Sequence, residues 1–299
     1  MRVAPTLVVL AAGLARRYGG CKPLAPIGPR GEAVIDLLVN DALTAGFGRI
    51  VLVLHPETGP AIRYHVAQCW PPSVEVAYAE QRLPLGTVHA VLAAAEAVGG
   101  NEAFAVCNAD DVYGEVAMGL LAGHLAKSDD EHVLVAYRLG ATVATDDPVT
   151  RGICAVDGDG RLTALTERKM VTRGADGRTF TAKDGRGPEE LDADLPASVN
   201  LWGFRPEIWA VFDAAMTASG LDEEALLEAG GGDPPSEVLL PEVLAASVSS
   251  GSGLPVRVIT TDARLVGVTH AADLPVVSAE LARQVAWGTR PDQLWMATT

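Results

Sequence analysis

The first 125 residues of the chain alternate between short apolar runs and segments with helical periodicity. The segments with helical spacing lie at Ala33–Ala45, Pro60–Gln68 and Thr87–Val98. Strands are expected around them at Leu7–Ala11, Ile50–Leu54, Val74–Ala79 and Ala103–Cys107, and Ile50–Leu54 is a continuous apolar run of the kind buried on both faces of a parallel sheet. This alternation predicts an α/β fold with a Rossmann-like, doubly wound and mostly parallel sheet. Ligands of such sheets bind at the carboxyl ends of the strands.

The second half of the chain indicates a more antiparallel extension of the sheet. Short strands are expected at His132–Arg138, Gly152–Val156, Leu162–Glu167, Ser198–Phe204 and Pro255–Thr260. Helices are expected at Ile208–Ser219, Ser236–Ala246 and Ala271–Trp287. The stretch 171–197 is polar and glycine-rich, so we interpret it as a flexible loop over the site or as disordered.

The composition narrows the class of partner. The chain has 299 residues, of which 48% are hydrophobic, and a formal net charge of −15. A large core is therefore expected, and nucleic acid and anionic membranes are disfavoured as partners. A small anion is not excluded, because a few cations and a divalent metal can hold it locally. The four scattered cysteines and the lack of a membrane-spanning run of ~18 apolar residues favour a cytoplasmic protein without zinc or disulfides.

A loop rich in glycine and cations follows the first apolar run. Gly13 lets the backbone approach a ligand closely, and Arg16, Arg17 and Lys22 carry positive charge within the next nine residues. Backbone N–H groups at the end of a strand, together with these cations, indicate a site for a polyphosphate. The G-x-G-x-x-G pattern of a dinucleotide fold is absent from this loop.

The residues of this loop resemble the signature of the sugar-1-phosphate nucleotidyltransferases, which make NDP-sugars. The resemblance rests on Leu10-Ala11-Ala12-Gly13, then Arg17, then Lys22-Pro23-Leu24, with Ala15 at the position of the usual second glycine. It implies a GT-A-type version of the Rossmann-like fold. It also implies that the residues from Leu10 to Gly13 contact the nucleotide, and that Arg17 and Lys22 are catalytic through the phosphates that they hold.

Two further stretches match the same family in the expected order. In Gln81-Arg-Leu-Pro-Leu-Gly86-Thr87, the resemblance implies that Gln81 reads the nucleobase and that Gly86 and Thr87 open the next helix beneath the nucleotide. In Asn108-Ala-Asp110-Asp111, the resemblance implies that Asn108 contacts the nucleotide, and Asp110 aligns with the family's metal ligand. Asp111 is a second candidate for the metal; the alternatives are that it supports the ligand Asp110 without touching the metal, or that it caps a helix. The implied metal is Mg²⁺, which prefers carboxylates and water.

The remaining family positions lie in the second half of the chain. Gly152, Glu167, Lys169 and Asn200 resemble the residues that bind the acceptor sugar. A second metal ligand is expected late in the chain, where both His270 and Asp273 are candidates. Asp273 also fits the N-cap of the final helix, so the choice stays open.

The resemblance implies one nucleotidyltransferase domain over residues 1–275. Residues 1–125 would bind the nucleotide, and residues 126–275, including 171–197, would bind the acceptor. Residues 276–299 would form a C-terminal helix and tail. The acceptor phosphate would attack the α-phosphorus of a nucleoside triphosphate in line, and pyrophosphate would leave. An acceptor phosphate is already ionised near neutral pH, so no general base is needed.

Two other functions fit the same residues. A metal-dependent glycosyltransferase of related fold would use the acidic motif, but its diphosphate-sugar donor has no γ-phosphate for Arg17 and Lys22 to bind. A non-catalytic nucleotide sensor would use the loop without turnover. The sequence leaves open the nucleobase and the acceptor, which is a sugar 1-phosphate or a similar phosphorylated metabolite. A homo-oligomer is compatible with it.

Overall fold

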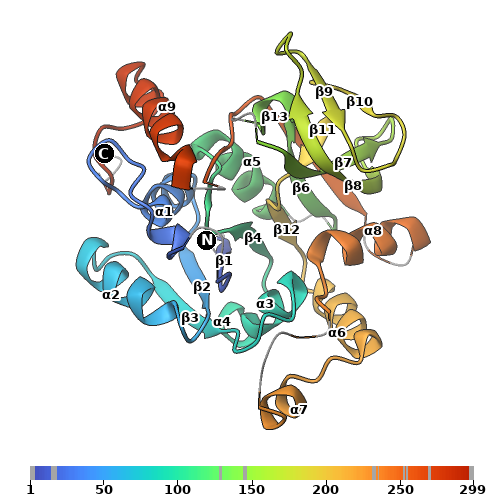
Figure 1. Cartoon of the computed structure of the whole chain (residues 1–299). Helices are drawn as coiled ribbons and strands as arrows, with labels where there is room; N and C mark the ends of the chain where they lie inside the picture. Colours follow the sequence, from blue (N-terminus) through green and yellow to red (C-terminus); the bar gives the residue numbers. More distant parts are fainter. Residues whose placement is uncertain are drawn as a thin grey trace.

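The computed structural model describes residues 4–14, 19–127, 130–143, 147–230, 234, 236–251, 253, 255–268 and 271–295. In this part of the chain, the strands form one large mixed sheet covered by helices, with a small two-stranded sheet beside it (Figure 1). The large sheet has the order β10-β9-β8-β7-β11-β6-β12-β4-β1-β2-β3, and β13 pairs with β6. This arrangement confirms the predicted α/β, Rossmann-like fold.

The first half of the chain forms the parallel part of the sheet. Strand β1 (Thr6–Ala11) lies between β2 (Arg49–Leu54) and β4 (Phe104–Asn108), and β3 (Val76–Glu80) flanks β2. All three pairings are parallel, as the alternation of strands and helices predicted. The predicted helix at Thr87–Val98 is divided at Ala94 into α3 (Thr87–Ala93) and α4 (Ala95–Val98).

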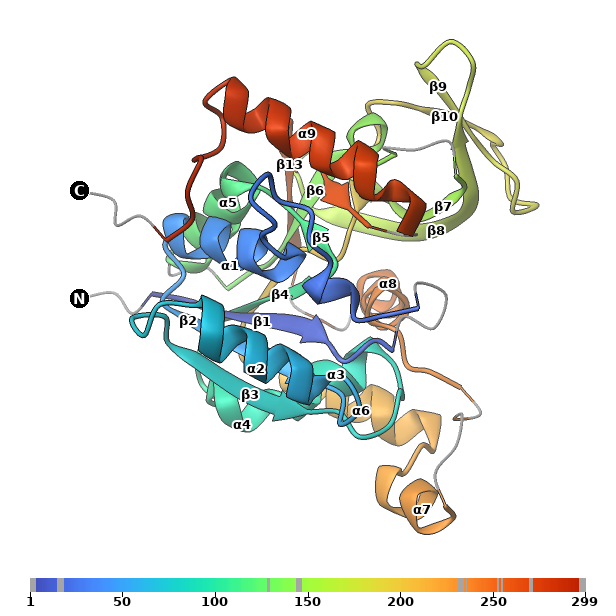
Figure 2. The same cartoon turned by 60° about the vertical axis from the view of Figure 1, so that its left-hand side comes forward.

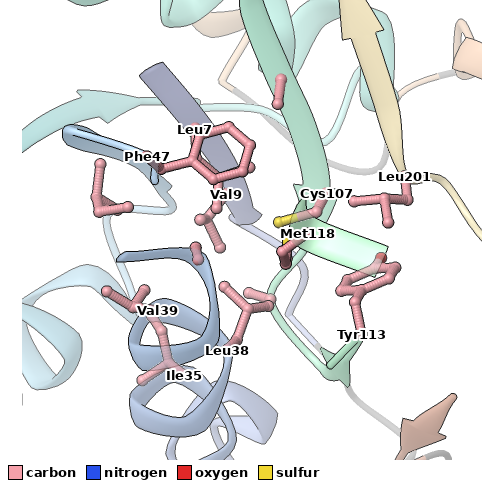
Figure 3. Close-up of a cluster of buried hydrophobic side chains, with 14 of the residues drawn as sticks. Leu7, Val9, Ile35, Leu38, Val39, Phe47, Cys107, Tyr113, Met118 and Leu201 are labelled. Atoms are coloured by element: carbon pink, nitrogen blue, oxygen red, sulfur yellow. The ribbon is translucent and has the colours of Figure 1, made fainter. Parts of the chain in front are cut away.

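Alternate residues of β1 face two different hydrophobic clusters, one on each side of the sheet. Leu7 and Val9 pack with α1 (Val34–Thr44), α2 (Gly59–Cys69) and α5 (Glu115–Leu125), as Figure 3 shows for part of this cluster. Val8 packs on the opposite side, where the cluster is completed by residues of α3, α4, α6 (Ile208–Ser219) and α8 (Leu240–Ser250). The period of two along an apolar strand thus produces the two helical layers.

The second half of the chain extends the sheet with antiparallel strands. The extension consists of β6 (His132–Arg138), β7 (Val149–Val156), β8 (Leu162–Arg173), β9 (Thr179–Ala182), β10 (Glu190–Asp192), β11 (Pro196–Ser198) and β12 (Trp202–Phe204). Strand β13 (Val256–Thr261) joins it in parallel with β6, and a turn at 157–160 connects β7 to β8. β12 lies between β6 and β4, and so joins the two halves.

The prediction of a loop at 171–197 was wrong. Strand β8 continues to Arg173, and β9, β10 and β11 all fall within the stretch. Only a few apolar side chains are buried there, among them Phe180, Leu191 and Ala197, which pack with Leu139 in a small separate cluster. Such sparse apolar positions leave a weak strand signal, because polar residues occupy the exposed face of the antiparallel strands.

The C-terminal region packs on the first helix of its own chain. Helix α9 (Leu274–Ala286) follows the short helix η3 (Ala271–Asp273), and Figure 2 shows α9 beside α1. Its Val277 and Leu281 belong to a cluster with Val34 and Leu37 of α1. Helix α7 (Glu223–Glu228) was not predicted from the sequence. None of the helices in the described residues is long and apolar enough to cross a membrane.

Candidate active site

The loop after β1 and the acidic stretch after β4 meet at the same edge of the sheet. The parallel register places Leu10 beside Asn108, so both strands end at one level. A cavity of about 510 Å³ opens there. It is lined by Leu10, Ala12, Gly13, Leu14, Gln81, Pro84, Gly86, Thr87, Ala90, Asn108, Asp110 and Glu237. The structure therefore brings most of the predicted nucleotide residues to one cavity.

The predicted phosphate-binding cation Lys22 lies beside the predicted metal ligand Asp110. The Lys22 Nζ atom is 3.5 Å from Asp110 Oδ2, and Lys22 starts the short helix η1 (Lys22–Leu24). Both residues, together with Ala11 and Gly13, line a smaller cavity of about 210 Å³. Arg17 lies outside the described residues, as does Ala15.

Asp111, the half-buried neighbour of Asp110, lines a different cavity. It begins the short strand β5 (Asp111–Val112), which pairs with β14 (Val266–Gly267), and its Oδ2 accepts a hydrogen bond of 3.3 Å from the Asn108 amide. Burial, followed by the charge of Asp110, raises the pKa of Asp111 to about 7, against the smaller opposite effects of Arg151, Asn108 and Lys22. Two adjacent carboxylates thus share a site with too little positive charge to neutralise both.

The late segment that was expected to supply a second metal ligand does reach this site. Val268 N donates a hydrogen bond of 3.3 Å to the Asp110 carbonyl, and β14 lies beside Asp111. His270 lies outside the described residues, and Asp273, which is buried at the start of α9, is not among the residues that line the cavities around Asp110. Among the described residues, no three His, Cys, Asp or Glu side chains are grouped to hold a metal.

The predicted base-reading segment also lines the large cavity. Gln81 is 5% exposed, and its Nε2 donates a hydrogen bond of 2.9 Å to the Gly86 carbonyl. Thr87 Oγ1 accepts a hydrogen bond of 2.7 Å from Leu240 N, which ties α3 to the start of α8. The segment before α8 also places Glu237 in the cavity. Sequence reasoning missed Glu237, because a surface glutamate far from the motifs carries no local signal.

Gly86 is held against the segment before α8 in a conformation that other residues rarely adopt. Its φ is +102°, and a Cβ atom built there would lie 2.3 Å from the Val238 carbonyl oxygen. Because Val238 N and O both bond to the main chain around Gly86, at Leu85 and Val88, this backbone cannot move away easily.

We expect Gly86→Ala to lower the free energy of unfolding by about 3 kcal/mol, because a positive φ and a backbone clash both oppose the new side chain. Gly99→Ala is the matched control. Its φ is +87°, but a Cβ there meets nothing within 4 Å, so the loss should be only about 1 kcal/mol. Urea denaturation of both variants measures the difference. Equal losses would show that the contact with Val238 has no role.

The predicted acceptor residues surround two adjoining cavities on the other side of Asn108. Gly152, Glu167 and Asn200 line a cavity of about 190 Å³, and Asn108 and Asp111 also line it. A second cavity of about 330 Å³ is lined by Gly152, Glu167, Lys169, Asp184 and Arg186, together with residues of β8 and α8. Asn108 therefore lines both the cavity of about 510 Å³ and the cavity of about 190 Å³.

Sheet pairing and backbone conformation position these acceptor-side residues. Gly152 pairs with Glu167 across the β7–β8 hairpin, and Lys169 Nζ lies 3.5 Å from Glu167 Oε1. Asn200 has a φ of +60°, which divides the predicted strand 198–204 into β11 and β12, and its Oδ1 accepts a hydrogen bond of 3.4 Å from Trp202. Trp202 itself is fully buried in the core.

Arg151 lines the cavity of about 190 Å³, and sequence reasoning missed it. Asp111 lines the same cavity, and the Arg151 guanidinium donates hydrogen bonds to the carbonyl oxygens of Thr150 and Thr142. A single arginine in a strand gives no functional signal in a sequence, since surface arginines are common.

Comparisons with known proteins agree with this geometry. The family model of the MobA-like NTP transferase domain matches residues 7–173, which is more than half of the chain. No curated protein sequence matches significantly. A crystal structure from Bacillus anthracis, described as a glucose-1-phosphate thymidylyltransferase in complex with a sucrose, is similar in fold with a TM-score of 0.64. That match covers 93% of this chain and 95% of the other, at 12% sequence identity. The chain belongs to the family of MobA-like NTP transferase domains, and it is a nucleotidyltransferase.

Proposed function

We propose that the protein condenses a nucleoside triphosphate with a phosphorylated sugar, such as a sugar 1-phosphate, to give an NDP-sugar and pyrophosphate. The observation that carries this proposal is the meeting of two cavities at Asn108 and the neighbouring aspartates. A nucleotide in one cavity would present its phosphates to an acceptor in the other. The similarity in fold to a glucose-1-phosphate thymidylyltransferase supports a sugar 1-phosphate as the acceptor.

In this proposal, the first 125 residues bind the nucleotide. The base lies at Gln81 and Gly86, and the triphosphate passes Gly13 toward Lys22 and Asp110. The ammonium group of Lys22 neutralises charge on the β- and γ-phosphates and on the departing pyrophosphate, a task that Arg17 is expected to share. Positioning and charge neutralisation supply most of the catalysis in phosphoryl transfer.

Asp110 and Asp111 would hold a Mg²⁺ ion. The donor set fits, because Mg²⁺ takes one or two carboxylates and completes its shell with water and phosphate oxygens. The raised pKa of Asp111 near Asp110 also fits a site that lacks one positive charge. When bound, the ion would supply charge stabilisation at the phosphate oxygens. Lys22 and the Asn108 amide would orient the two carboxylates from either side.

Residues 126–275 bind the acceptor in this proposal. Glu167 and Asn200 accept hydrogen bonds from sugar hydroxyls, and Lys169 neutralises the acceptor phosphate. A side chain at Gly152 would approach Leu165 and Ser198 to within 3.0 and 3.3 Å, so glycine keeps the cavity open. A phosphate oxygen of the acceptor forms the new bond to the α-phosphorus as the bond to the β-phosphate oxygen breaks.

A pyrophosphate-release assay tests the proposal. Each of five nucleoside triphosphates, with Mg²⁺, is combined with a panel of sugar 1-phosphates. We expect release that needs both substrates and that falls about a hundredfold in Lys22→Ala, because a cation at the leaving phosphates is lost. Lys127→Ala is the matched control, since this exposed lysine lies at the end of α5 and lines neither substrate cavity.

The other outcomes of this assay separate the alternative functions. A nucleotide that binds without any release of pyrophosphate would indicate a sensor. Transfer of sugar from a nucleotide-sugar to an acceptor, without release of pyrophosphate, would indicate a glycosyltransferase. Equal activity of the wild type and Lys22→Ala would contradict the role given to the loop after β1.

A further inference from the structure

The side-chain amide of Gln81 is held in one orientation by two acceptors. Its Nε2 lies 2.9 Å from the Gly86 carbonyl oxygen, which can only accept a hydrogen bond. The same Nε2 lies 3.2 Å from His89 Nδ1. Both N–H groups of the amide are therefore used inside the protein, and the orientation of the amide follows from the chemistry of its partners.

His89 is set up to be the second of these acceptors. It lies on α3, and its other ring nitrogen, Nε2, is 3.8 Å from Glu223 Oε1. The carboxylate of Glu223 is held by Arg82 and by the main chain of Leu83, so it favours a proton on His89 Nε2 and leaves Nδ1 free to accept. Burial lowers the pKa of His89, which agrees with a neutral ring.

The carbonyl oxygen of the Gln81 amide remains for a ligand. Gln81 lines the nucleotide cavity, and among the described residues no donor lies within hydrogen-bonding distance of Oε1. An amide oxygen can only accept hydrogen bonds. A nucleobase edge that presents only acceptors to Gln81 Oε1 would bind unfavourably, because two buried acceptors would face each other without a hydrogen-bond donor.

We infer that His89 is a positioning residue that fixes Gln81 with its oxygen toward the base, so that the site selects a nucleobase presenting an N–H donor to Gln81 Oε1. The inference rests on the proposed function, because the proposed function places the base at Gln81. Uracil and thymine offer such a donor from their ring N–H, and cytosine and adenine from their amino groups, with guanine offering both kinds. A base without these groups should bind more weakly.

The test compares normal nucleotides with analogues that have no N–H group on the base. The triphosphate of 2-pyrimidinone riboside replaces the pyrimidine nucleotides, and that of unsubstituted purine riboside replaces ATP and GTP. Neither analogue is bulkier than the base it replaces, so a loss of affinity cannot come from a clash. Isothermal titration calorimetry measures the Kd of each nucleotide with the full-length wild type, His89→Asn and His89→Leu.

We expect the wild type to bind the donor-free analogue about tenfold more weakly than the preferred nucleotide. His89→Asn should keep this penalty, because asparagine can place an oxygen acceptor where Nδ1 lies. His89→Leu has nearly the same size but no acceptor, so the amide of Gln81 becomes free to turn and the penalty should fall below about threefold. If His89 had only a structural role, His89→Leu would weaken the binding of the normal nucleotide and of the donor-free analogue by the same factor.

Three results would overturn the inference. The Kd of the wild type for the donor-free analogue could lie within about twofold of its Kd for the normal nucleotide, a result that requires no variant. His89→Leu could keep the full penalty. In both cases, pyrophosphate release by the wild type would leave the proposed function standing. If no nucleotide binds at all, the proposed function fails and this inference fails with it.

Discussion

Asp110→Asn is expected to lower the rate of pyrophosphate release about a thousandfold while making the metal-free protein more stable. The loss of rate follows from the proposed role of Asp110, since asparagine is a neutral and much weaker ligand for Mg²⁺ than a carboxylate. The ion pair between Lys22 and Asp110, 3.5 Å long and partly exposed, is also lost, but such pairs contribute little to stability.

The gain in stability follows from the pKa of Asp111. Its folded-state value of about 7 lies above the value of about 3.9 in an unfolded chain, so stability falls as the pH rises from about 4 to about 7. The charge of Asp110 is the second-largest cause of this raised pKa, after burial. Removing that charge lowers the pKa of Asp111, and less stability is then lost at high pH.

Urea denaturation in the presence of a chelator measures this effect at pH 5 and pH 8. We expect Asp110→Asn to exceed the wild type at pH 8 by on the order of 2 kcal/mol, the repulsion between two nearby unit charges at the effective dielectric constant of a protein. The gain should be small at pH 5, where Asp111 is protonated in both proteins. Asp213→Asn, an exposed site on α6, is the control and should change neither rate nor stability. An active or less stable Asp110→Asn protein would contradict the prediction.

The sequence predicted the parallel half of the fold because each of its elements carries a strong local signal. The four expected strands match β1 to β4, three of them as continuous apolar runs, and the expected helix at 33–45 matches α1. Parallel strands bring their carboxyl ends together, so the position of Gly13 and Asp110 at one edge also followed from local patterns. The order of the strands in the antiparallel half did not follow, because β12 and β13 pair with strands far away in the sequence.

The candidate site could be predicted only where it is built from contiguous motifs. The contacts of Asp111 with β14 and of Gly86 with Val238 join residues more than 150 positions apart. No local periodicity or spacing encodes such contacts. The same limit explains why Glu237 and Arg151 were missed, although both line the cavities of the site.

Arg290→Met is expected to lower the free energy of unfolding by about 3 to 5 kcal/mol near pH 8. Arg290 lies after α9 and donates two hydrogen bonds of 2.8 Å to the two carboxylate oxygens of Asp41 on α1. The two side chains are only 5% and 4% exposed. Removing the guanidinium would leave a buried carboxylate without its cation, which costs more than the loss of a surface pair.

The pH dependence of this loss identifies the unpaired carboxylate as its cause. Burial raises the pKa of Asp41 even with Arg290 present, and the charge of Arg290 opposes that rise. Without Arg290 the pKa of Asp41 in the folded protein rises further. The stability of the variant then keeps falling with rising pH up to a higher pH than in the wild type. The deficit of Arg290→Met should therefore be largest at pH 8 and shrink at acid pH, where the folded variant holds a neutral Asp41.

A double variant and a surface control complete this experiment. Asp41→Leu combined with Arg290→Met removes both charges and should recover most of the stability, because a buried ion pair is often replaceable by apolar side chains. Arg283→Met removes an arginine of α9 that pairs with Glu280 and is 54% exposed, so we expect a loss below about 0.5 kcal/mol. Urea denaturation of all three variants at pH 4.5 and pH 8 measures these differences. A pH-independent loss in Arg290→Met that the double variant fails to recover would mean that Arg290 anchors the C-terminal segment through packing, and that its charge contributes little.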